Sequence, residues 1–265
     1  MREELVVGKS LADCYHQALC LLQENGEDAD CSDWGQRQKE LSMTIQVLEP
    51  LAEPMISKLF IGGPRELEQY RQEMLDGILD FEVEKGNWAY TYHDRMVNYS
   101  VDDTRKSKNH YSLNQIEFVV EELLRNPSSR RAVINIRDNS VDAYSDDPAC
   151  LQHIQYFIRE DKLHCKVLFR SNDACKASFM NMFALIMLQQ RIANELDVEM
   201  GTYTHRANSF HCYEKDYDML EGYYKRIKEG GDVASDYIDD WKDMMEEYQE
   251  DIENSVKILK NRGTN

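Results

Sequence analysis

Two residues that together permit covalent chemistry on an anionic substrate lie at the two ends of a predicted hairpin. Cys150 stands just before residues 152–159, and Arg170 is the last residue of 163–170; both segments alternate between apolar and polar side chains. A thiolate is a nucleophile, and a nearby guanidinium lowers the pKa of a thiol and binds phosphate oxygens through paired donors. A lone cysteine is usually a small buried hydrophobe, so the hypothesis rests on the pair. The pattern indicates covalent attack on a phosphorylated small molecule.

Other polar side chains follow at positions where they could join this pair. Ser171 and Asp173 continue the second segment, Asn181 lies in an apolar helix, and His211 and Tyr213 come after a short predicted strand. Each has an ordinary structural explanation, since asparagine caps helix turns and histidine and tyrosine are often partly buried amphipathic side chains. Together they predict a polar binding site around the thiol.

Three further arginines are candidates for binding a phosphate group. Arg37 lies in a polar stretch, residues 27–40, that is predicted to be a surface loop. Arg130 and Arg131 stand at the entrance of a predicted strand, residues 132–136. Adjacent arginines are most often solvated, but a planar guanidinium offers paired donors that match phosphate oxygens.

The elements that must position these residues are predicted from apolar spacing and from capping and turn residues. The spacing predicts helices over residues 10–24, 65–75, 113–125 and 178–195, of which the last is the most apolar and is expected to be central. It predicts strands over 43–48, 132–136, 152–159, 163–170 and 200–204. From residue 232 onward the chain is strongly acidic, and one or two amphipathic helices are expected over about 232–262.

Length and composition limit the classes of protein that remain. A chain of 265 residues with 42% hydrophobic and 30% charged residues can form one domain spanning 1–265, and no repeat or linker divides it. A formal charge of −18 would repel nucleic acids and anionic membranes, so neither is an expected partner.

The seven cysteines show no regular spacing, which argues against disulfides and against a metal site. The start of the chain lacks a signal-peptide pattern, and no apolar run is long enough to cross a membrane. A cytoplasmic protein with reduced thiols is expected.

Several of these motifs, taken together, resemble one known family. They are Asn126-Pro127-x-Ser129-Arg130-Arg131, Pro148-Ala149-Cys150, Phe169-Arg170-Ser171-x-Asp173, Phe179-x-Asn181 and His211-x-Tyr213. Their order and spacing are similar to those of the thymidylate synthase and pyrimidine hydroxymethylase family over roughly residues 35 to 215. Tyr90-Thr91-Tyr92-x-x-Arg95 looks closer to archaeal-type members. The resemblance implies an α+β sandwich with a large mixed sheet at a two-fold dimer interface.

The resemblance also implies roles for the site residues. Cys150 would add to C6 of the base, Asn181 would hold N3 and O4, and Tyr90 joins the catalytic candidates. The expected ligands of the phosphate are Arg170, Ser171 and Arg37, with Arg130 and Arg131 reaching the site of the partner in a homodimer. His211 and Tyr213 would bind the sugar 3′ hydroxyl, and Asp173 the pterin of 5,10-methylenetetrahydrofolate.

The chain departs from the family pattern at several points. Leu151 stands where the family often has histidine, and residues 174–178 replace a Gly-rich, Pro-containing run on the folate side. Residues 261–265 are polar, where ordinary thymidylate synthases end in an apolar tail that closes over folate. The catalytic glutamate does not align, so Glu53 and Glu68 both remain candidates.

Three functions stay open from the sequence. The first is methylation of dUMP to dTMP, with folate supplying carbon and hydride. The second is 5-hydroxymethylation of dUMP, dCMP or CMP, in which water replaces the hydride; the altered folate side favours it. Asn181 favours uracil in either case, because a cytosine-specific enzyme would be expected to carry an acid there. The third is a non-catalytic nucleotide-binding protein, which the presence of Cys150 disfavours.

Overall fold

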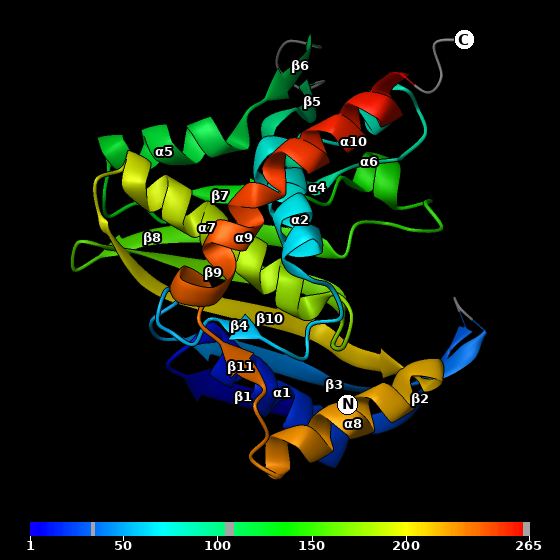
Figure 1. Ribbon diagram of the computed structural model, residues 1–265. Helices are drawn as coiled ribbons and strands as arrows, with labels where there is room; N and C mark the ends of the chain where they lie inside the picture. Colours follow the sequence, from blue (N-terminus) through cyan, green and yellow to red (C-terminus); the bar gives the residue numbers. More distant parts are fainter. Residues whose placement is uncertain (33–34, 104–108, 262–265) are drawn as a thin grey trace.

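A mixed seven-stranded sheet forms the centre of the computed structural model, which describes residues 1–32, 35–103 and 109–261 (Figure 1). Its order is β1-β3-β10-β9-β8-β7, with β2 paired to β3. The β1–β3 and β9–β10 pairs are parallel and the others are antiparallel. The strands are β1 (Glu3–Gly8), β2 (Glu27–Cys31), β3 (Gln36–Val47), β7 (Val133–Asn135), β8 (Leu151–Arg159), β9 (Lys162–Asp173) and β10 (Glu199–Tyr213). The expected α+β class with a large mixed sheet is confirmed.

Two short sheets lie outside this one. The strand β4 (Ile56–Ser57) pairs with β11 (Ala234–Ser235), and β5 (Tyr99–Asp103) pairs with β6 (Asn109–Leu113). The first of these ties the beginning of the C-terminal segment to residues that follow β3.

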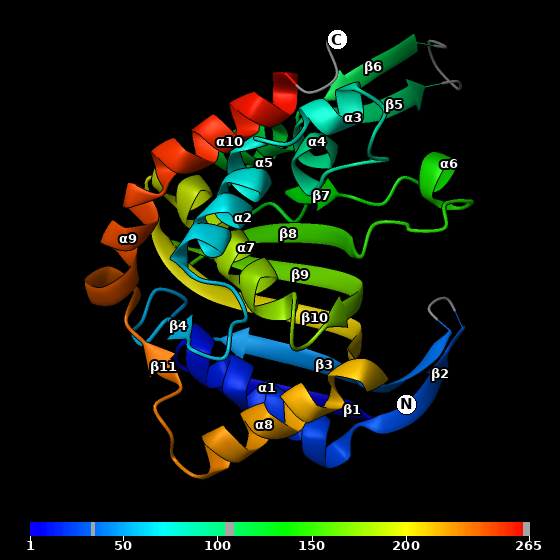
Figure 2. The ribbon, with the colours of Figure 1, turned by 45° about the vertical axis from the view of Figure 1, so that its right-hand side comes forward.

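Helices pack on one side of the sheet, with α7 against β9 and β10 and α1 against β1 and β3 (Figures 1 and 2). Within the described ranges none is long and apolar enough to cross a membrane. The helices are α1 (Leu11–Asn25), α2 (Pro64–Asp76), α3 (Phe81–Glu84), α4 (Tyr92–Val97), α5 (Gln115–Arg125), α6 (Asn139–Asp142), α7 (Ser178–Glu195), α8 (Tyr217–Lys228), α9 (Lys242–Glu247) and α10 (Gln249–Asn261), with short turns η2 (Glu214–Asp216) and η3 (Tyr237–Trp241).

The predicted helices are confirmed as α1, α2, α5 and α7, with ends set by the expected signals. Ser10 accepts a hydrogen bond from the Asp13 amide at the start of α1, and Gly77 ends α2 in the left-handed region at φ 62°. The predicted hairpin is β8–β9, and its turn places Glu160 and Asp161 at φ 51° and 55°. Apolar spacing is reliable here because α1, α2 and α5 bury one face, α7 is apolar over most of its length, and the hairpin strands alternate.

The predicted surface loop over residues 27–40 is wrong. These residues form β2 and the first part of β3, which pair in an antiparallel ribbon at one end of the sheet, where residues 38–40 of β3 also pair with the end of β10 (Figure 2). Most of the β2 side chains are exposed or half-buried, so its residues are polar on both faces and show no apolar alternation. The strand predicted over 200–204 likewise extends to Tyr213, which places His211 and Tyr213 on β10 itself.

The acidic C-terminal segment packs on α2 and on the residues that follow it. Ile252 and Val256 of α10 are buried against Leu79 and Phe81, and α9 contacts α2. Figure 1 shows α10 running beside α2. Helical structure over the predicted extension is confirmed for its described part, and residues 262–265 lie outside that part.

Glu53 anchors this segment. Its carboxylate accepts hydrogen bonds from the backbone amides of Met55, Tyr237 and Ile238 at 2.8, 2.9 and 3.0 Å. One side chain thus joins the chain before β4 to the turn η3.

We expect Glu53→Ala to lower the free energy of unfolding by about 1–3 kcal/mol, because three backbone donors lose their acceptor. Limited proteolysis should cleave the variant faster near residues 230–240. Glu49→Ala is the matched control, since Glu49 makes only an exposed ion pair with Lys9 at 3.7 Å. Equal stability of the two variants in urea titrations would contradict the anchoring role.

Candidate active site

A cavity of about 720 Å³ opens where β9 and β10 end and α7 begins. Its other walls come from the β2–β3 ribbon, through Cys31 and Gln38, and from residues 145–148 before β8. Of the residues singled out in the sequence, the cavity is lined by Cys150, Arg170, Ser171, Asp173, Asn181, His211 and Tyr213. The structure therefore brings together residues from a loop, two strands and a helix. In the sequence these residues span 63 positions, from Cys150 to Tyr213.

Arg170 braces the segment that carries Cys150. Its Nη2 donates to the Pro148 carbonyl at 2.7 Å and its Nε to the Ala149 carbonyl at 3.2 Å. The backbone amide of Arg170 also donates to the Cys150 carbonyl at 2.8 Å. Because Nη1 is not used in these bonds, the guanidinium can hold the loop and still offer a donor to an anion.

The net electrostatic environment of Cys150 favours the neutral thiol. Burial raises the pKa of Cys150 above its ordinary value, and Asp147 raises it further, while the Arg170 guanidinium lowers it. The expected effect of Arg170 is present, but burial outweighs it. A substrate that adds charge or hydrogen bonds near the thiol would shift this balance.

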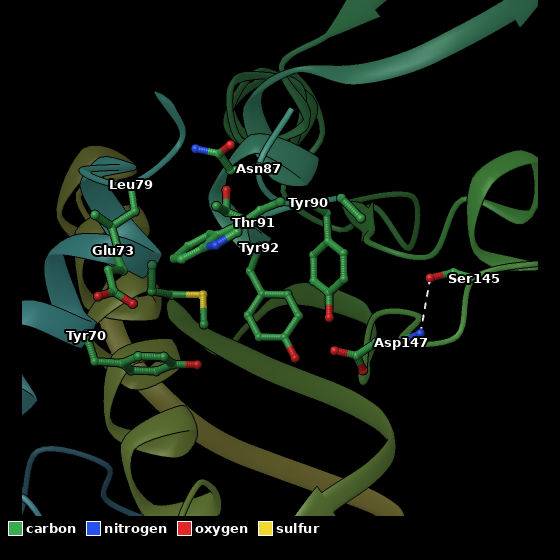
Figure 3. A pocket seen from close by; sticks show the side chains of 12 residues that line it. Tyr70, Glu73, Leu79, Asn87, Tyr90, Thr91, Tyr92, Ser145 and Asp147 are labelled. Carbon is green, nitrogen blue, oxygen red and sulfur yellow. Dashed lines mark hydrogen bonds between the residues drawn. The ribbon is translucent and has the colours of Figure 1, made fainter. Parts of the chain in front are cut away.

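Four tyrosines surround the thiol. Burial raises the pKa of Tyr70, Tyr90, Tyr92 and Tyr213, and a negative charge on Cys150 would raise it further, so each hydroxyl is within electrostatic reach of the sulfur. The Leu151 amide donates to the Tyr92 hydroxyl at 3.4 Å. In Figure 3 the Tyr90 and Tyr92 hydroxyls point toward the side of the cavity where the Asp147 carboxylate lies. The wall beside the nucleophile is therefore rich in hydroxyl groups.

Asn181 presents a held amide to the same cavity. Its side chain is 5% exposed, the Tyr70 hydroxyl donates to its Oδ1, and its Nδ2 donates to Asn172 Oδ1 at 3.2 Å. One N–H and one oxygen lone pair remain, and these form a donor and acceptor pair suited to the edge of a pyrimidine base.

His211 has a free nitrogen inside the cavity wall. Its Nδ1 lies 3.3 Å from the Ser171 hydroxyl, which can donate or accept, and 3.3 Å from the Ser209 carbonyl, which can only accept. A hydrogen bond to that carbonyl puts the proton on Nδ1 and leaves Nε2 as an acceptor. That Nε2 is buried without a partner among the described residues. Burial lowers the pKa of His211, which keeps the ring neutral. The Tyr213 ring packs edge-on against it at 4.7 Å, so the pair suits a hydroxyl group.

Asp173 supports the turn that leads into α7. Its Oδ1 accepts from the backbone amides of Cys175 and Lys176 at 3.0 and 2.9 Å. Its carboxylate nevertheless lines the cavity, beside Ser171 and His211.

The remaining candidates do not line this cavity. Arg37 is exposed on the ribbon, 3.7 Å from Asp30. Arg131 pairs with buried Glu122 at 3.0 Å, and Arg130 is exposed beside it. Glu53 holds the C-terminal segment, as described above. Glu68 is 2% exposed and pairs with Arg71 at 2.7 Å, outside both this cavity and the adjoining one.

A second cavity of about 520 Å³ adjoins the first and shares Tyr92, Ser145 and Asp147 with it (Figure 3). Its wall is largely aromatic and apolar and includes one glutamate. The wall contains Tyr70, Glu73, Met74, Leu79, Trp88 and Tyr90. Gln69 Nε2 donates to Glu73 Oε1 at 2.8 Å, and burial raises the pKa of Glu73. A carboxyl group with a raised pKa can exchange protons closer to neutral pH than an exposed one.

Residues 63–253 match the family model described as thymidylate synthase. The chain belongs to the thymidylate synthase family. This family consists of methyltransferase-type enzymes, and the resemblance drawn from the five motifs is confirmed. In the described part of the chain, no group of three or more His, Cys, Asp or Glu side chains is arranged to hold a metal ion.

Individual thymidylate synthase relatives agree with this membership. A protein named "Putative thymidylate synthase" from Methanocaldococcus jannaschii is 32% identical over 222 residues, which are 81% of this chain and 93% of the relative. One of the same name from Methanosarcina barkeri is 27% identical and covers 84% of this chain and 95% of its own length. The solved structure of thermostable thymidylate synthase A from Bacillus subtilis has the same fold, with a TM-score of 0.62, 17% identity and coverage of 82% of this chain and 84% of that one.

Several residues of the two cavities were not identified from the sequence. Tyr70 and Glu73 lie one helical turn apart in α2 and line the second cavity. Tyr92 lines both cavities. Asn172 and His205 are buried behind Asn181. No signal in the sequence pointed to Glu73, because α2 is mostly polar and Glu73 is not one of its buried residues. For Asn172 and His205 the signal was a polar residue at a buried position of a strand whose residues alternate between buried and half-buried.

We expect Arg170→Met to slow alkylation of Cys150 by iodoacetamide about three- to tenfold at pH 8. The guanidinium favours the thiolate, so its removal raises the thiol pKa and lowers the thiolate fraction at a given pH. Peptide mapping by mass spectrometry separates Cys150 from the other cysteines, and the pH profile of the rate should move to higher pH. Arg137→Met is the control, because among the described residues the Arg137 side chain bonds to Asn139 alone. An unchanged profile would exclude an electrostatic effect of Arg170.

Proposed function

We propose that this chain transfers a one-carbon unit from 5,10-methylenetetrahydrofolate to C5 of dUMP and so forms dTMP. The observation that carries the proposal is one cavity in which a nucleophilic thiol, a held amide and an unpartnered histidine nitrogen face the same space. These groups suit the base and the sugar of one pyrimidine nucleotide. The family membership supports the reaction class.

Cys150 starts the reaction as the nucleophile. C6 of uracil is electrophilic because it is conjugated to the C4 carbonyl, so a thiolate can form a bond there and move charge onto O4 and C5. The Nδ2 of Asn181 would donate to O4 and stabilise the charge that develops, while Oδ1 would accept from N3–H. C5 then has the electron density needed to form a new carbon–carbon bond.

The other end of the cavity suits the sugar and phosphate. His211 Nε2 is an acceptor, and the Tyr213 hydroxyl beside it can complete a pair of hydrogen bonds to a 3′ hydroxyl. Arg170 Nη1 and the Ser171 hydroxyl, both on the cavity wall, would bind the phosphate. A phosphate dianion beside Cys150 would be repelled by the Asp147 carboxylate, so the donors of Arg170 and Ser171 would have to offset that repulsion.

The adjoining cavity fits the folate. Its volume and aromatic wall suit a flat pterin and an aminobenzoyl ring, with Trp88, Tyr90 and Leu79 as the packing surfaces. Glu73 would accept hydrogen bonds from the pterin or exchange a proton near the base. When bound, the folate supplies the one-carbon unit and, for a methyl product, the hydride.

A second candidate reaction is hydroxymethylation of the same carbon in dUMP, dCMP or CMP. The hydroxyl groups of Tyr90 and Tyr92 and the Asp147 carboxylate make the wall beside Cys150 polar. Such a wall can hold a water molecule, and water in place of hydride gives a 5-hydroxymethyl group. The Cys150 adduct is common to both reactions, and base recognition by Asn181 is common to them where the base is uracil.

We expect wild-type protein to convert dUMP with methylenetetrahydrofolate to dTMP and dihydrofolate, identified by mass. A 5-hydroxymethyl nucleotide with tetrahydrofolate would instead support the second reaction, and dCMP and CMP are tested in parallel. Cys150→Ala should reduce turnover by more than about a thousandfold, because the covalent step is lost. Cys31→Ala, at another thiol of the same cavity, is the control. Tight dUMP binding without any product would overturn both reactions and indicate a non-catalytic nucleotide-binding protein.

We also infer that the protein acts as a homodimer in which Arg130 and Arg131 reach the partner's phosphate site. The face of the sheet opposite α7 carries half-buried side chains such as Gln155, Phe157 and Leu168, which are on neighbouring strands. Glu122 holds the arginine pair through Ser129 at 2.6 Å and Arg131 at 3.0 Å, away from the chain's own cavity. A two-fold interface makes such an exchange reciprocal.

Mixing inactive Cys150→Ala with an inactive Arg130→Ala variant should restore roughly a quarter of wild-type activity. Random exchange puts one subunit of each variant in half of the dimers. In each such dimer one of the two sites is intact, because it combines Cys150 of one subunit with Arg130 of the other. Sedimentation establishes that dimers form and exchange. Exchanged dimers that regain no activity would show that Arg130 serves its own chain's site or none.

A further inference from the structure

The β2–β3 ribbon brings two polar side chains to the end of the cavity where His211 and Tyr213 lie. Gln38 lines the cavity and is paired across the sheet with Tyr213 of β10. Glu40, two residues further along β3, is paired with His211 in the same way. Paired residues of antiparallel strands point to the same face, with their Cβ atoms about 5 Å apart. Gln38 and Glu40 therefore stand beside the two residues proposed to bind the 3′ hydroxyl.

Strand alternation turns the neighbouring Arg37 the other way. Successive side chains of a strand point to opposite faces, so Gln38 faces the cavity and Arg37 faces away from it. Arg37 lies 3.7 Å from Asp30, its partner in β2. Among the described residues, the ribbon contributes Cys31 and Gln38 to the cavity wall and no cationic side chain. Such a wall suits a neutral group of a nucleotide better than its phosphate.

Glu40 fixes which way round the Gln38 amide is held. Gln38 Nε2 donates to Glu40 Oε2 at 2.8 Å, and the Ser209 hydroxyl donates to the same oxygen at 2.5 Å. A carboxylate only accepts, so turning the amide over would set the Gln38 oxygen against a carboxylate oxygen. The amide therefore keeps one N–H donor and its Oε1 for a ligand.

The charge at this end of the cavity also favours a hydroxyl group over a phosphate oxygen. Burial lowers the pKa of His211, and the negative charges of Asp173 and Glu40 partly offset that effect. Both carboxylates therefore act on the space beside the His211 ring. They would repel an anion there, whereas a neutral hydroxyl group meets no such repulsion.

A sugar hydroxyl has room for the donor that Gln38 offers. A hydroxyl group has one proton to donate and two lone pairs that accept. His211 Nε2 would take the proton, and the Tyr213 hydroxyl would donate to one lone pair. The second lone pair is then open to the remaining N–H of Gln38, which lies across from Tyr213.

We propose that Gln38, held by Glu40, is a further substrate-binding residue that donates a hydrogen bond to the 3′ hydroxyl of the nucleotide. Glu40 is a positioning residue, because it acts on the ligand through Gln38. The inference rests on the proposed function, since it requires a pyrimidine nucleotide in this cavity.

The test is calorimetric binding of dUMP and of 2′,3′-dideoxyuridine 5′-monophosphate, which lacks the hydroxyl, to the full chain without folate. Wild-type protein should bind dUMP at least about tenfold more tightly than the dideoxy nucleotide. Gln38→Leu should weaken dUMP binding about three- to tenfold, because one hydrogen bond is lost, and should change binding of the dideoxy nucleotide less than about twofold.

Gln36→Leu is the matched control for this substitution. Gln36 is half-buried two residues earlier in β3, and it does not line the cavity. Binding of both nucleotides should stay within about twofold of wild type, as expected for a side chain without ligand contact. Thermal melting establishes that each variant is folded, and Gln38→Ala replaces Gln38→Leu should the latter not fold.

Glu40→Leu tests the positioning role. The released Gln38 amide can turn over, so binding of dUMP should weaken while binding of the dideoxy nucleotide does not. The double variant of Gln38→Leu and Glu40→Leu should bind dUMP no more weakly than Gln38→Leu alone, since the second change acts through the first. Losses that add in the double variant would overturn the role of Glu40.

Three results would overturn the role of Gln38 and leave the proposed function standing. They are a wild-type protein that binds dUMP and the dideoxy nucleotide equally, a Gln38→Leu variant that weakens both to the same extent, and one that weakens neither. Wild-type protein that binds neither nucleotide would instead refute the proposed function, and the inference with it.

Discussion

Parallel pairing of β9 with β10 is the interaction on which the site depends. Its register sets Ser171 opposite Ser209 and Asp173 opposite His211, so the proposed phosphate-binding and sugar-binding residues meet at one end of the sheet. Antiparallel pairing of β8 with β9 then places Leu151 opposite Phe169, and so brings Cys150 next to Arg170. A slip of one residue in either pair would turn these side chains to the other face.

The helix α7 is the second constraint, because it closes the same end of the sheet. It is the most deeply buried helix, and its first turns carry Asn181 over the ends of β9 and β10. Polar groups in such a place must be paired: Tyr70 and Asn172 bond to Asn181, and His205 lies within hydrogen-bond distance of Asn172. The residues that stabilise the core here are therefore also those that orient the amide.

Neighbouring groups in the site act on Cys150 in opposite directions. Burial and Asp147 favour the thiol, Arg170 favours the thiolate, and the surrounding tyrosines remain neutral donors. A nucleophile kept protonated until substrate arrives is protected from unwanted reaction with other electrophiles. The polar wall between the two cavities is where methylation and hydroxymethylation would diverge, because it sets whether water can approach C5.

The sequence by itself determined the helices α1, α2, α5 and α7, the β8–β9 hairpin and seven of the sixteen residues that line the cavity around Cys150, including Asn181 and His211. These follow from local periodicity and from motif order, which short stretches of chain contain. It did not reveal the β2–β3 ribbon, whose two faces are polar, or the positions of Tyr70, Glu73 and Asn172. Only the tertiary structure decided that Glu53 and Glu68 lie away from the thiol and that His205 stands behind Asn181, because such contacts depend on how distant segments pack.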